Sequence, residues 1–577
     1  MTSITGMKTS ACIHFGTGTP ASLPFTGMAS SSHFGPEAPA AKPEWLLQLI
    51  RQNDAAVMSH RSMKVTEKGN RYFGAYRDAN LIVTPNATVE FLTRGCGAIG
   101  TPESAYHRSG LLLQELDDAI GGLLALQHSD GTIDLLETNF HSASHTAFMV
   151  KRLTPAYTIF RDAAIPGSEG TLRRIEQFLK RAGEALIVGG LHTPNHRWVV
   201  CAALTTLHLQ WPDSRYVARA EEWLAEKIDL DPDGQYTEKS TAGYSAEIDR
   251  VLITVANGLG KPELLDAVRK NLRMMRYYLH PNGEVVTEAS NRQDKGTIGT
   301  MEGYYFALRY MAILDNDGEF ASICRIIEGG AFNRLASYLE LFLTTPLTWG
   351  PLPALKPLPV SYIRTFPYSG VVRIRRNDWD CTILSNNAGW LTFHKKHVML
   401  QAMRLAGSFF GKGQFLSSDI RQEGSHWVLT QEIEGVYYQP YPRDRIPGDG
   451  DWAKMPKLNR KMSEIQRYKT VVRISETPTG IRVDIDVSGT EHVPVALELI
   501  FRKGGQFTGV EAHPGKPDAY LMSGEKATYT MGGERISFGP GRADHRNVSL
   551  RGALPSMDAP SVFITGQTPF RHSIEIG

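Results

Sequence analysis

The sequence DGQYTEKS, at residues 233–240, separates two helical patterns and decides our prediction for the first half of the chain. Its Asp-Gly pair is typical of a tight turn, and a Glu follows in a short polar loop. The same order of turn, Glu-containing loop and apolar helix recurs at Asp130-Gly131 and at Asn282-Gly283. Each helix pair must bury its apolar face against its neighbours, so the repeat predicts a solenoid or a closed ring. In a ring, the three loops would gather around one cleft.

Two hydrophobic periods divide the chain. Over residues 43–345, apolar residues recur at three- and four-residue spacing, as at 111–124, and no convincing strand interrupts them. The Pro-rich linker 346–360 can continue neither a helix nor a central strand. Over residues 361–577 the period is two, as at 481–487. We therefore predict an α+β multidomain protein, in which an (α/α) toroid, incomplete or closed, precedes an antiparallel β-sandwich.

Composition excludes several classes of protein. Apolar residues make up 42% and charged residues 21% of the 577 residues, and the formal net charge is +2. These values are ordinary for a globular protein and favour neither nucleic acid nor a membrane surface as partner. No apolar stretch is long enough to span a membrane. The five cysteines are scattered without a CxxC pair, which argues against disulfides and thiolate metal clusters, and Cys201 is predicted to be a buried thiol.

Residues 1–42 are rich in Ser, Thr, Gly, Pro and Ala. They lack the charged and the continuous apolar regions of an export signal, so we expect a disordered leader and a cytoplasmic location. The composition does not specify an oligomeric state, and a homo-oligomer is compatible with it.

The sequence HTPNHRW, which begins at His192, is a polar segment before an apolar helix pattern. Thr193 is a good helix N-cap, and the Pro that follows suits the first helical position. Asn195, His196 and Arg197 then fall in the first turn, where free backbone N–H groups and the helix dipole favour an anion. An amide, an imidazole and a guanidinium at this end could bind a carboxylate. The alternative interpretation is capping residues and a solvated Arg.

The later loops supply candidates for proton transfer and sugar binding. In the second loop, Tyr236, Glu238 and Tyr244 could move protons, because neighbouring cations can lower the pKa of a Tyr. The alternative is that one Tyr packs under the loop while Glu238 caps a helix. In the third loop, Arg292 could bind an acidic sugar. Trp452 lies in an aromatic, Pro-rich segment of the second half that could border a sugar cleft.

The first loop ends in a polar set immediately before an apolar helix: Glu137, Asn139, His141 and His145. We expect these residues, with His192, to bind substrate. The two histidines of the loop are four residues apart, as are His192 and His196, and this spacing can chelate a metal from one helix face. Pro194 separates the second pair, however, and no obvious carboxylate completes either site. We therefore predict no metal ligands and no cofactor, although a divalent metal is compatible with the other predictions.

These motifs resemble those of the heparinase II/III-like and alginate lyase-like polysaccharide lyases. Asn195-His196 resembles the Asn-His pair of those enzymes, and the stretch 233–244 is similar to their Asp-Gly-x-x-x-Glu-x-Ser…Tyr loop. The sequence FPYSGV at 366–371 is similar to the opening of their sandwich, and DWAKMP at 451–456 resembles a loop of chondroitin-type lyases. The segment near His394 departs from the family pattern, because it lacks the His-Ala-Asp or His-Gly-Asp run.

The resemblance implies a toroid with a C-terminal β-sandwich, and β-elimination on a uronate-containing glycan or oligosaccharide as substrate. In that chemistry Asn195, His196 and Arg197 would neutralise the substrate carboxylate and stabilise an enolate-like transition state. Tyr244, or Tyr236 as second choice, would remove the C5 proton and then protonate the leaving O4.

Two other functions fit the same residues. A uronate-specific glycoside hydrolase of the glucuronidase type would use two of Glu137, Glu238 and Glu288 as acid and base. The same architecture occurs in such hydrolases, so the fold alone does not select the reaction. The third alternative is a non-catalytic glycan-binding protein, although such a protein does not need this many titratable groups.

Overall fold

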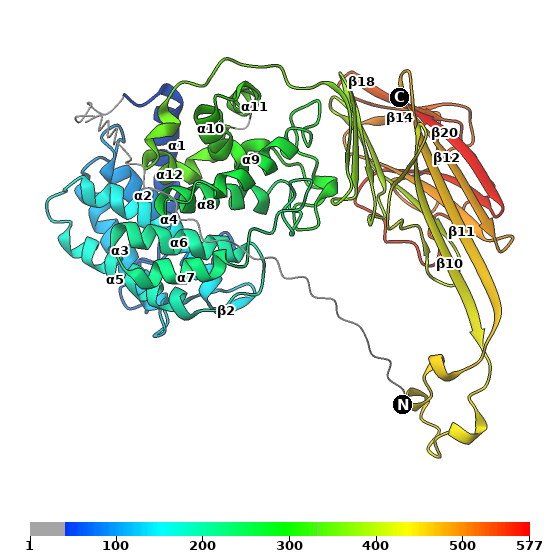
Figure 1. Cartoon of the computed structure of the whole chain (residues 1–577), viewed down its shortest axis with the longest axis horizontal. Coiled ribbons are helices and arrows are strands. Elements are labelled where there is room, and N and C mark those ends of the chain that lie inside the picture. Colours follow the sequence, from blue (N-terminus) through cyan, green and yellow to red (C-terminus); the bar gives the residue numbers. More distant parts are fainter. Residues whose placement is uncertain (1–40, 331) are drawn as a thin grey trace, which may run out of the picture. The chain divides into compact units, whose positions relative to one another are not determined.

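The computed structural model describes residues 41–330 and 332–577, and the part of the predicted leader before residue 41 lies outside the described residues. Helices form the first half of the described chain and strands the second half (Figure 1). The last helical turn of the first half is η5 (Pro346–Trp349), and the first sandwich strand is β3 (Ser361–Phe366). The predicted order of a helical half and a sheet half is confirmed.

The helices form two layers. The inner helices pack one against the next in chain order: α2 (Pro85–Gly100), α4 (Ala143–Asp162), α6 (His196–Gln210), α8 (Tyr244–Gly258) and α10 (Tyr305–Asp315). The outer helices pack against them: α3 (Gly110–Leu126), α5 (Glu169–Val188), α7 (Ser214–Leu224), α9 (Leu264–Met275) and α11 (Gly318–Gly329). Burial separates the layers, because α8 is buried along most of its length whereas α7 buries only Tyr216 and Ala220.

Further helices complete this half. Helices α1 (Glu44–His60) and α12 (Leu339–Leu343) pack against each other and against α2. The short 3-10 turns are η1 (Arg61–Met63), η2 (Thr287–Ala289), η3 (Met301–Tyr304) and η4 (Phe332–Tyr338). None of the helices in the described part of the chain is long and apolar enough to cross a membrane. Cys201 is a buried free thiol, as predicted.

The repeated turns need glycine. Gly131, Gly234 and Gly283 have φ angles of +88°, +102° and +86°. At Gly234, an added Cβ would lie 2.7 Å from the carbonyl oxygen of Lys270 on the outer helix α9. Only glycine adopts such a backbone at such a close approach without strain. Each turn therefore leads the chain tightly from an outer helix into the polar loop before the next inner helix.

Two local predictions are wrong. A short hairpin of β1 (Ile133–Leu135) and β2 (Asn139–Ser142) interrupts the helical half, because the first loop folds back and pairs with itself. Helix α6 begins at His196 and not at Pro194, and Asn195 is its N-cap. The hydroxyl of Thr193 does not cap the backbone, because it bonds to Nδ1 of the His196 ring at 2.6 Å.

The second half folds into two sheets. The larger sheet has the order β15 (Glu511–Ala512), β16 (Ala519–Leu521), β19 (Ser561–Gln567), β13 (Pro494–Phe501), β7 (Val398–Gly407), β6 (Leu391–Lys395), β5 (Trp379–Leu384), β4 (Val371–Arg376) and β3, with β8 (Gly413–Gln414) paired to β7. The smaller sheet has the order β14 (Gln506–Thr508), β17 (Ala527–Met531), β18 (Glu534–Gly539), β20 (Phe570–Ile576), β12 (Gly480–Gly489), β11 (Met462–Thr477), β10 (His426–Tyr438) and β9 (Arg421–Glu423). Among the named strands of the described residues, pairing is antiparallel except between β16 and β19. The predicted alternation is confirmed, since Ile481, Val483, Ile485 and Val487 all lie in the core of this half.

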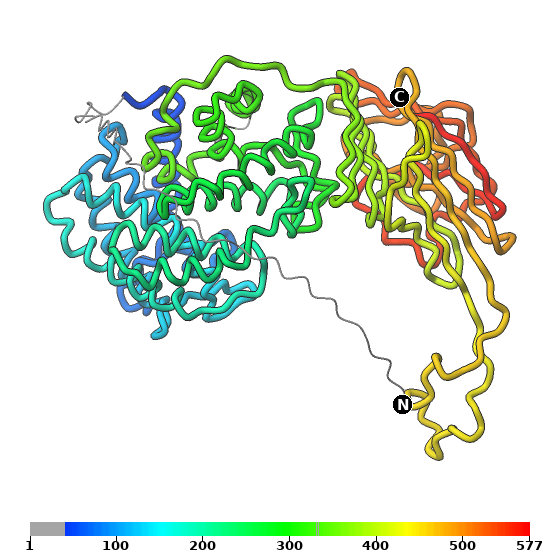
Figure 2. The backbone as a smooth tube through the Cα atoms, in the orientation of Figure 1, coloured from blue at the N-terminus to red at the C-terminus, as the bar shows by residue number. Residues whose placement is uncertain are grey.

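Strands β10 and β11 extend into a long two-stranded ribbon (Figure 2). The segment that joins them contains three 3-10 turns: η6 (Arg443–Arg445), η7 (Trp452–Lys454) and η8 (Lys457–Asn459). Trp452 belongs to this segment, and its side chain is exposed beneath the Arg460 guanidinium, 4.3 Å from the ring centroid.

Polar contacts join the second and third repeated loops to the sandwich. The backbone N–H of Ser369 donates to Asp233 at 2.8 Å. The guanidinium of Arg502 makes two hydrogen bonds to Glu284, at 2.9 and 2.7 Å. Because the loops are tied at Asp233 and Glu284, the polar residues that follow them in the sequence are held in place.

Candidate active site

A carboxylate lies at the start of helix α6. The backbone N–H of Asn195 donates to Oε1 of Glu238, with a nitrogen–oxygen distance of 3.4 Å. An anion is favoured at this end of a helix, because the backbone dipoles leave it positive. Burial raises the pKa of Glu238 and outweighs the opposing effect of Arg292. The second repeated loop therefore meets the start of α6, as predicted.

The third loop adds a cation to this carboxylate. Nε of Arg292 lies 3.2 Å from Oε2 of Glu238. The same guanidinium lies over the ring of Tyr244, 5.4 Å from its centroid. The Tyr244 hydroxyl donates to Oε1 of Gln293 at 3.4 Å. Tyr244 is half-buried and is the first residue of α8, where its backbone N–H donates to the Ser240 hydroxyl at 2.9 Å.

Uncharged imidazoles line the same region. Burial, and to a smaller extent the nearby His192, Arg292 and His145, lower the pKa of His196 to about 4. The rings of His192 and His196 lie 5.3 Å apart, and Nε2 of His192 lies 3.4 Å from the amide of Asn139. Burial also lowers the pKa of His145 to about 4. Both His145 and His196 are therefore neutral near pH 7.

The side chain of Asn195 has an unusual environment. Both its amide nitrogen and its carbonyl oxygen are buried, and neither has a hydrogen-bond partner among the described residues. Buried polar groups in native proteins are normally paired, so an unpaired amide requires an explanation. A polar ligand that reaches the start of α6 would provide both partners.

Outside the first loop, three predicted residues do not join this cluster. Arg197 points to Glu226 and Asp229, with nitrogen–oxygen distances of 3.0 and 3.1 Å, and so carries no free charge for a ligand. Tyr236 is fully buried and donates to Asp249 at 2.8 Å. Burial raises the pKa of Tyr236 well above its ordinary value, which makes it unsuitable as a base. Trp452 lies at the end of the β10–β11 ribbon.

The first loop divides its residues between two places. Glu137 is exposed and lines an open cavity of about 470 Å³, with Asp134 and Asn86 among its other walls. His141 pairs with Asp130 at 2.7 Å, whereas His145 bonds to Asn86. These two histidines therefore have different partners. Asn139 and His145 remain next to the cluster around His196.

Sequence reasoning missed Asn86 and Gln293. A signal for Asn86 was present, because the sequence TPN occurs at residues 84–86 and again at 193–195. Each copy lies at the start of an inner helix, α2 and α6 respectively. No motif or spacing in the sequence indicated Gln293, because only the fold brings its amide to Tyr244.

Comparison with known proteins identifies the fold. No protein-family model matches the sequence, and the curated proteins include no match. A Paenibacillus xanthan lyase structure matches with TM-score 0.56 and 9% identity, over 92% of this chain and 57% of that chain. A chondroitin AC lyase of Streptomyces coelicolor A3 matches with TM-score 0.52 and 10% identity, over 94% of this chain and 80% of that chain. Heparinase III matches with TM-score 0.50 and 11% identity, over 93% of this chain and 82% of that chain.

The chain therefore has the fold of the polysaccharide lyases that combine a helical toroid with a β-sandwich, and the predicted fold class is confirmed. It spans 57% of the length of the xanthan lyase that it matches. At identities of 9% to 11% the likeness concerns the fold alone.

Proposed function

We propose that this protein is a lyase that cleaves a uronate-containing glycan or oligosaccharide by β-elimination. The observation that carries the proposal is the continuous set of contacts from Asn195 through Glu238 and Arg292 to Tyr244. This set combines a free amide, a partly exposed cation and a phenol at one end of the inner helices. These are the groups that elimination next to a carboxylate requires.

Each group has a proposed role. The amide of Asn195 and the guanidinium of Arg292 bind the substrate carboxylate and stabilise the negative charge that develops on it. Arg292 replaces Arg197 in this role, because Arg197 is already paired with two carboxylates. Glu238 orients Arg292 until substrate binds. The neutral imidazole of His196 offers a second hydrogen-bond partner in the same region.

Tyr244 is the proposed base and acid. Its ionised oxygen takes the proton from C5, the electron pair forms the C4–C5 double bond, and the C4–O4 bond breaks. The same hydroxyl then gives its proton to O4, so no proton is gained or lost overall. Tyr236 is not proposed as the base, because its hydroxyl is buried against Asp249.

The contacts favour elimination over hydrolysis. A hydrolase needs two carboxyl groups that flank one glycosidic bond. The three candidates have separate surroundings: Glu137 is exposed, Glu238 pairs with Arg292, and Glu288 is buried beneath the sandwich strands. These different surroundings do not support an acid and a base that act on one glycosidic bond.

The test is a panel of uronate glycans that includes chondroitin, heparan sulfate, alginate and xanthan-derived oligosaccharides. We expect at least one substrate to give ultraviolet absorbance from a 4,5-unsaturated uronate together with new reducing ends. New reducing ends without that absorbance would establish a hydrolase instead. Binding of a glycan with neither product would establish a binding protein. Tyr244→Phe protein is the control for contaminating activity.

A further inference from the structure

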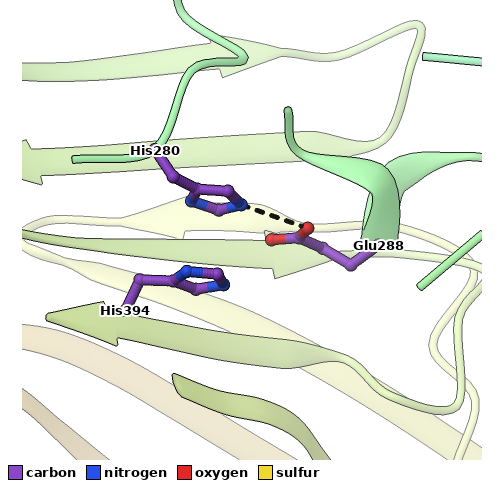
Figure 3. A group of neighbouring side chains, drawn as sticks. All are labelled: His280, Glu288 and His394. Carbon is purple, nitrogen blue, oxygen red and sulfur yellow. Dashed lines mark hydrogen bonds and ion pairs between the residues drawn. The ribbon is translucent and has the colours of Figure 1, made fainter. Parts of the chain in front are cut away.

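A second cluster of titratable side chains shares no residue with the candidate active site. His280 follows helix α9, Glu288 lies in η2, and His394 lies in strand β6 (Figure 3). One ligand atom from each of these side chains lies within 4.8 Å of the others. The three are 2%, 6% and 1% exposed, so the group is enclosed by protein.

His394 lacks the partners that a buried imidazole needs. Neither of its ring nitrogens has a hydrogen-bond partner among the described residues. Its ring stacks on that of His280, with centroids 3.6 Å apart and an angle of 7° between the planes. An imidazole that carries one proton has one nitrogen with a free lone pair, which can bind a metal ion. An unpaired lone pair in this position points to a missing ligand.

The surrounding residues orient the other two side chains. Nδ1 of His280 bonds to Asp380 at 2.9 Å, so its Nε2 faces Glu288 at 3.4 Å. Asp380 is itself held by Arg373 at 2.7 Å. A carboxylate behind a histidine is the usual support of a metal-binding imidazole, because it fixes the ring and its tautomer.

Glu288 is oriented in the same manner. The hydroxyls of Thr382 and Thr392 both donate to its Oε1, each at 2.8 Å. Oε2 is left facing His280. The backbone carbonyl of Glu288 also accepts from the amide of Asn387 at 3.0 Å. The side chain is therefore held with Oε2 directed at Nε2 of His280, so that both atoms could contact one ion.

We propose that His280, Glu288 and His394 bind one divalent transition-metal ion, with Zn²⁺ as the best fit. Two imidazoles and one carboxylate are ligands that Zn²⁺ accepts, and a water completes four-coordination. Ca²⁺ and Mg²⁺ prefer oxygen ligands and fit this set poorly. The ion joins the third repeated loop to the sandwich, and Arg292 and Gln293 follow Glu288 in that loop. The inference does not depend on the proposed lyase activity.

The first test is metal binding by the full chain, prepared without an affinity tag. After equilibration with Zn²⁺ and removal of the free ion, we expect about one Zn²⁺ per chain by elemental analysis. Co²⁺ should bind with the strong visible absorption of a four-coordinate site. Removal of the metal with a chelator should lower the melting temperature by about 3 °C or more. Less than about a tenth of an ion per chain, or only the weak absorption of six-coordinate Co²⁺, would overturn the proposal.

Variants locate the ion. His394→Gln and Glu288→Gln should each lower zinc affinity by at least about tenfold, whereas His572→Gln, a histidine of the sandwich outside the cluster, should keep it. Thr382→Val leaves all three ligands in place and should weaken binding less than Glu288→Gln. If His394→Gln does not fold, the Co²⁺ spectrum of the unaltered chain still decides the question. Equal zinc affinity in His394→Gln and His572→Gln would assign the ion to another site.

Discussion

The two polar clusters use the same kinds of side chain in different ways. In the candidate active site, Arg292 pairs with Glu238, and its side chain remains 35% exposed. Behind the proposed metal cluster, Arg373 pairs with Asp380, which holds His280, and both Arg373 and Asp380 are fully buried. A partly exposed cation can exchange its partner for an incoming anion. A fully buried cation cannot, because the loss of its partner would leave an uncompensated charge.

The histidines differ in the same way. His196 is neutral, and it lies beside Thr193 and the exposed side chain of His192. His394 is enclosed, and neither of its ring nitrogens has a hydrogen-bond partner among the described residues. The comparison therefore separates a cluster suited to binding and turnover from a cluster suited to holding two parts of the chain together.

The largest effect is expected in the candidate active site. Tyr244→Phe removes only the hydroxyl, so turnover should fall by roughly 10²–10⁴-fold or more while substrate binding changes little. Initial rates and a binding titration with the same glycan measure both quantities. Tyr236→Phe is the matched control, and it should reduce stability by about 1–3 kcal/mol through loss of the bond to Asp249 while turnover per folded molecule is retained. The opposite pattern would transfer the role to Tyr236.

Among the variants proposed here, loss of the buried Arg373–Asp380 ion pair should have the largest effect on the free energy of unfolding. Asp380→Asn keeps the shape of the side chain and removes its charge, which leaves Arg373 without compensation. We expect the free energy of unfolding to fall by about 3–5 kcal/mol, as measured by urea titration. Asp484→Asn is the comparison, because its partner Arg482 is exposed, and its cost should be below about 1 kcal/mol. Similar costs for the two variants would contradict the distinction between buried and exposed pairs.

Two arginines test which cation binds substrate. Arg292→Ala should lower kcat/KM by roughly 10–100-fold, because a charged hydrogen bond to substrate contributes about 1.5–3 kcal/mol. Arg197→Ala should leave kcat/KM nearly unchanged and reduce stability instead, since it breaks the pairs with Glu226 and Asp229. Steady-state kinetics and thermal unfolding distinguish the two results. A larger kinetic loss in Arg197→Ala would restore the prediction made from the sequence.

The smallest effect concerns pH. His145 has a pKa of about 4 in the folded protein, below the ordinary value of about 6.5 that applies to the unfolded chain. Between these values the unfolded state binds more protons, so stability falls as the pH is lowered from 6.5 toward 4. We expect His145 to contribute about 1–3 kcal/mol to this loss. Urea titrations at both ends of the range should show a shallower dependence of stability on pH in His145→Gln than in the unaltered chain, and an equal dependence in the two proteins would contradict this assignment.

Much of the fold was open to prediction from the sequence. The Asp-Gly and Asn-Gly turns and the helical period identified the repeated helix pairs, because both signals are local and recur. The alternation at 481–487 identified a strand with one buried face for the same reason. The hairpin β1–β2 was missed, because its pairing depends on a loop that folds back over only a few residues.

The candidate site was only partly predictable. Asn195, His196, Glu238 and Tyr244 were identified because helix starts and polar loops are local patterns. The partner of each side chain was not predictable, and the sequence offered both Arg197 and Arg292 for binding an acidic substrate without indicating which of them is already paired. A sequence contains no information on which carboxylates surround a given arginine until distant segments are packed together.

The sequence by itself determined the helix pairs, the alternating strands and the polar loops between them, since each depends on neighbouring residues and on backbone preferences. Only the tertiary structure decided that Arg292 reaches Glu238 and Tyr244, that Tyr236 is buried against Asp249, and that His394 of strand β6 stacks on His280 from the helical half. These contacts join residues far apart in the chain. Their burial and charge, which decide what each side chain can do, exist only after the two halves have folded.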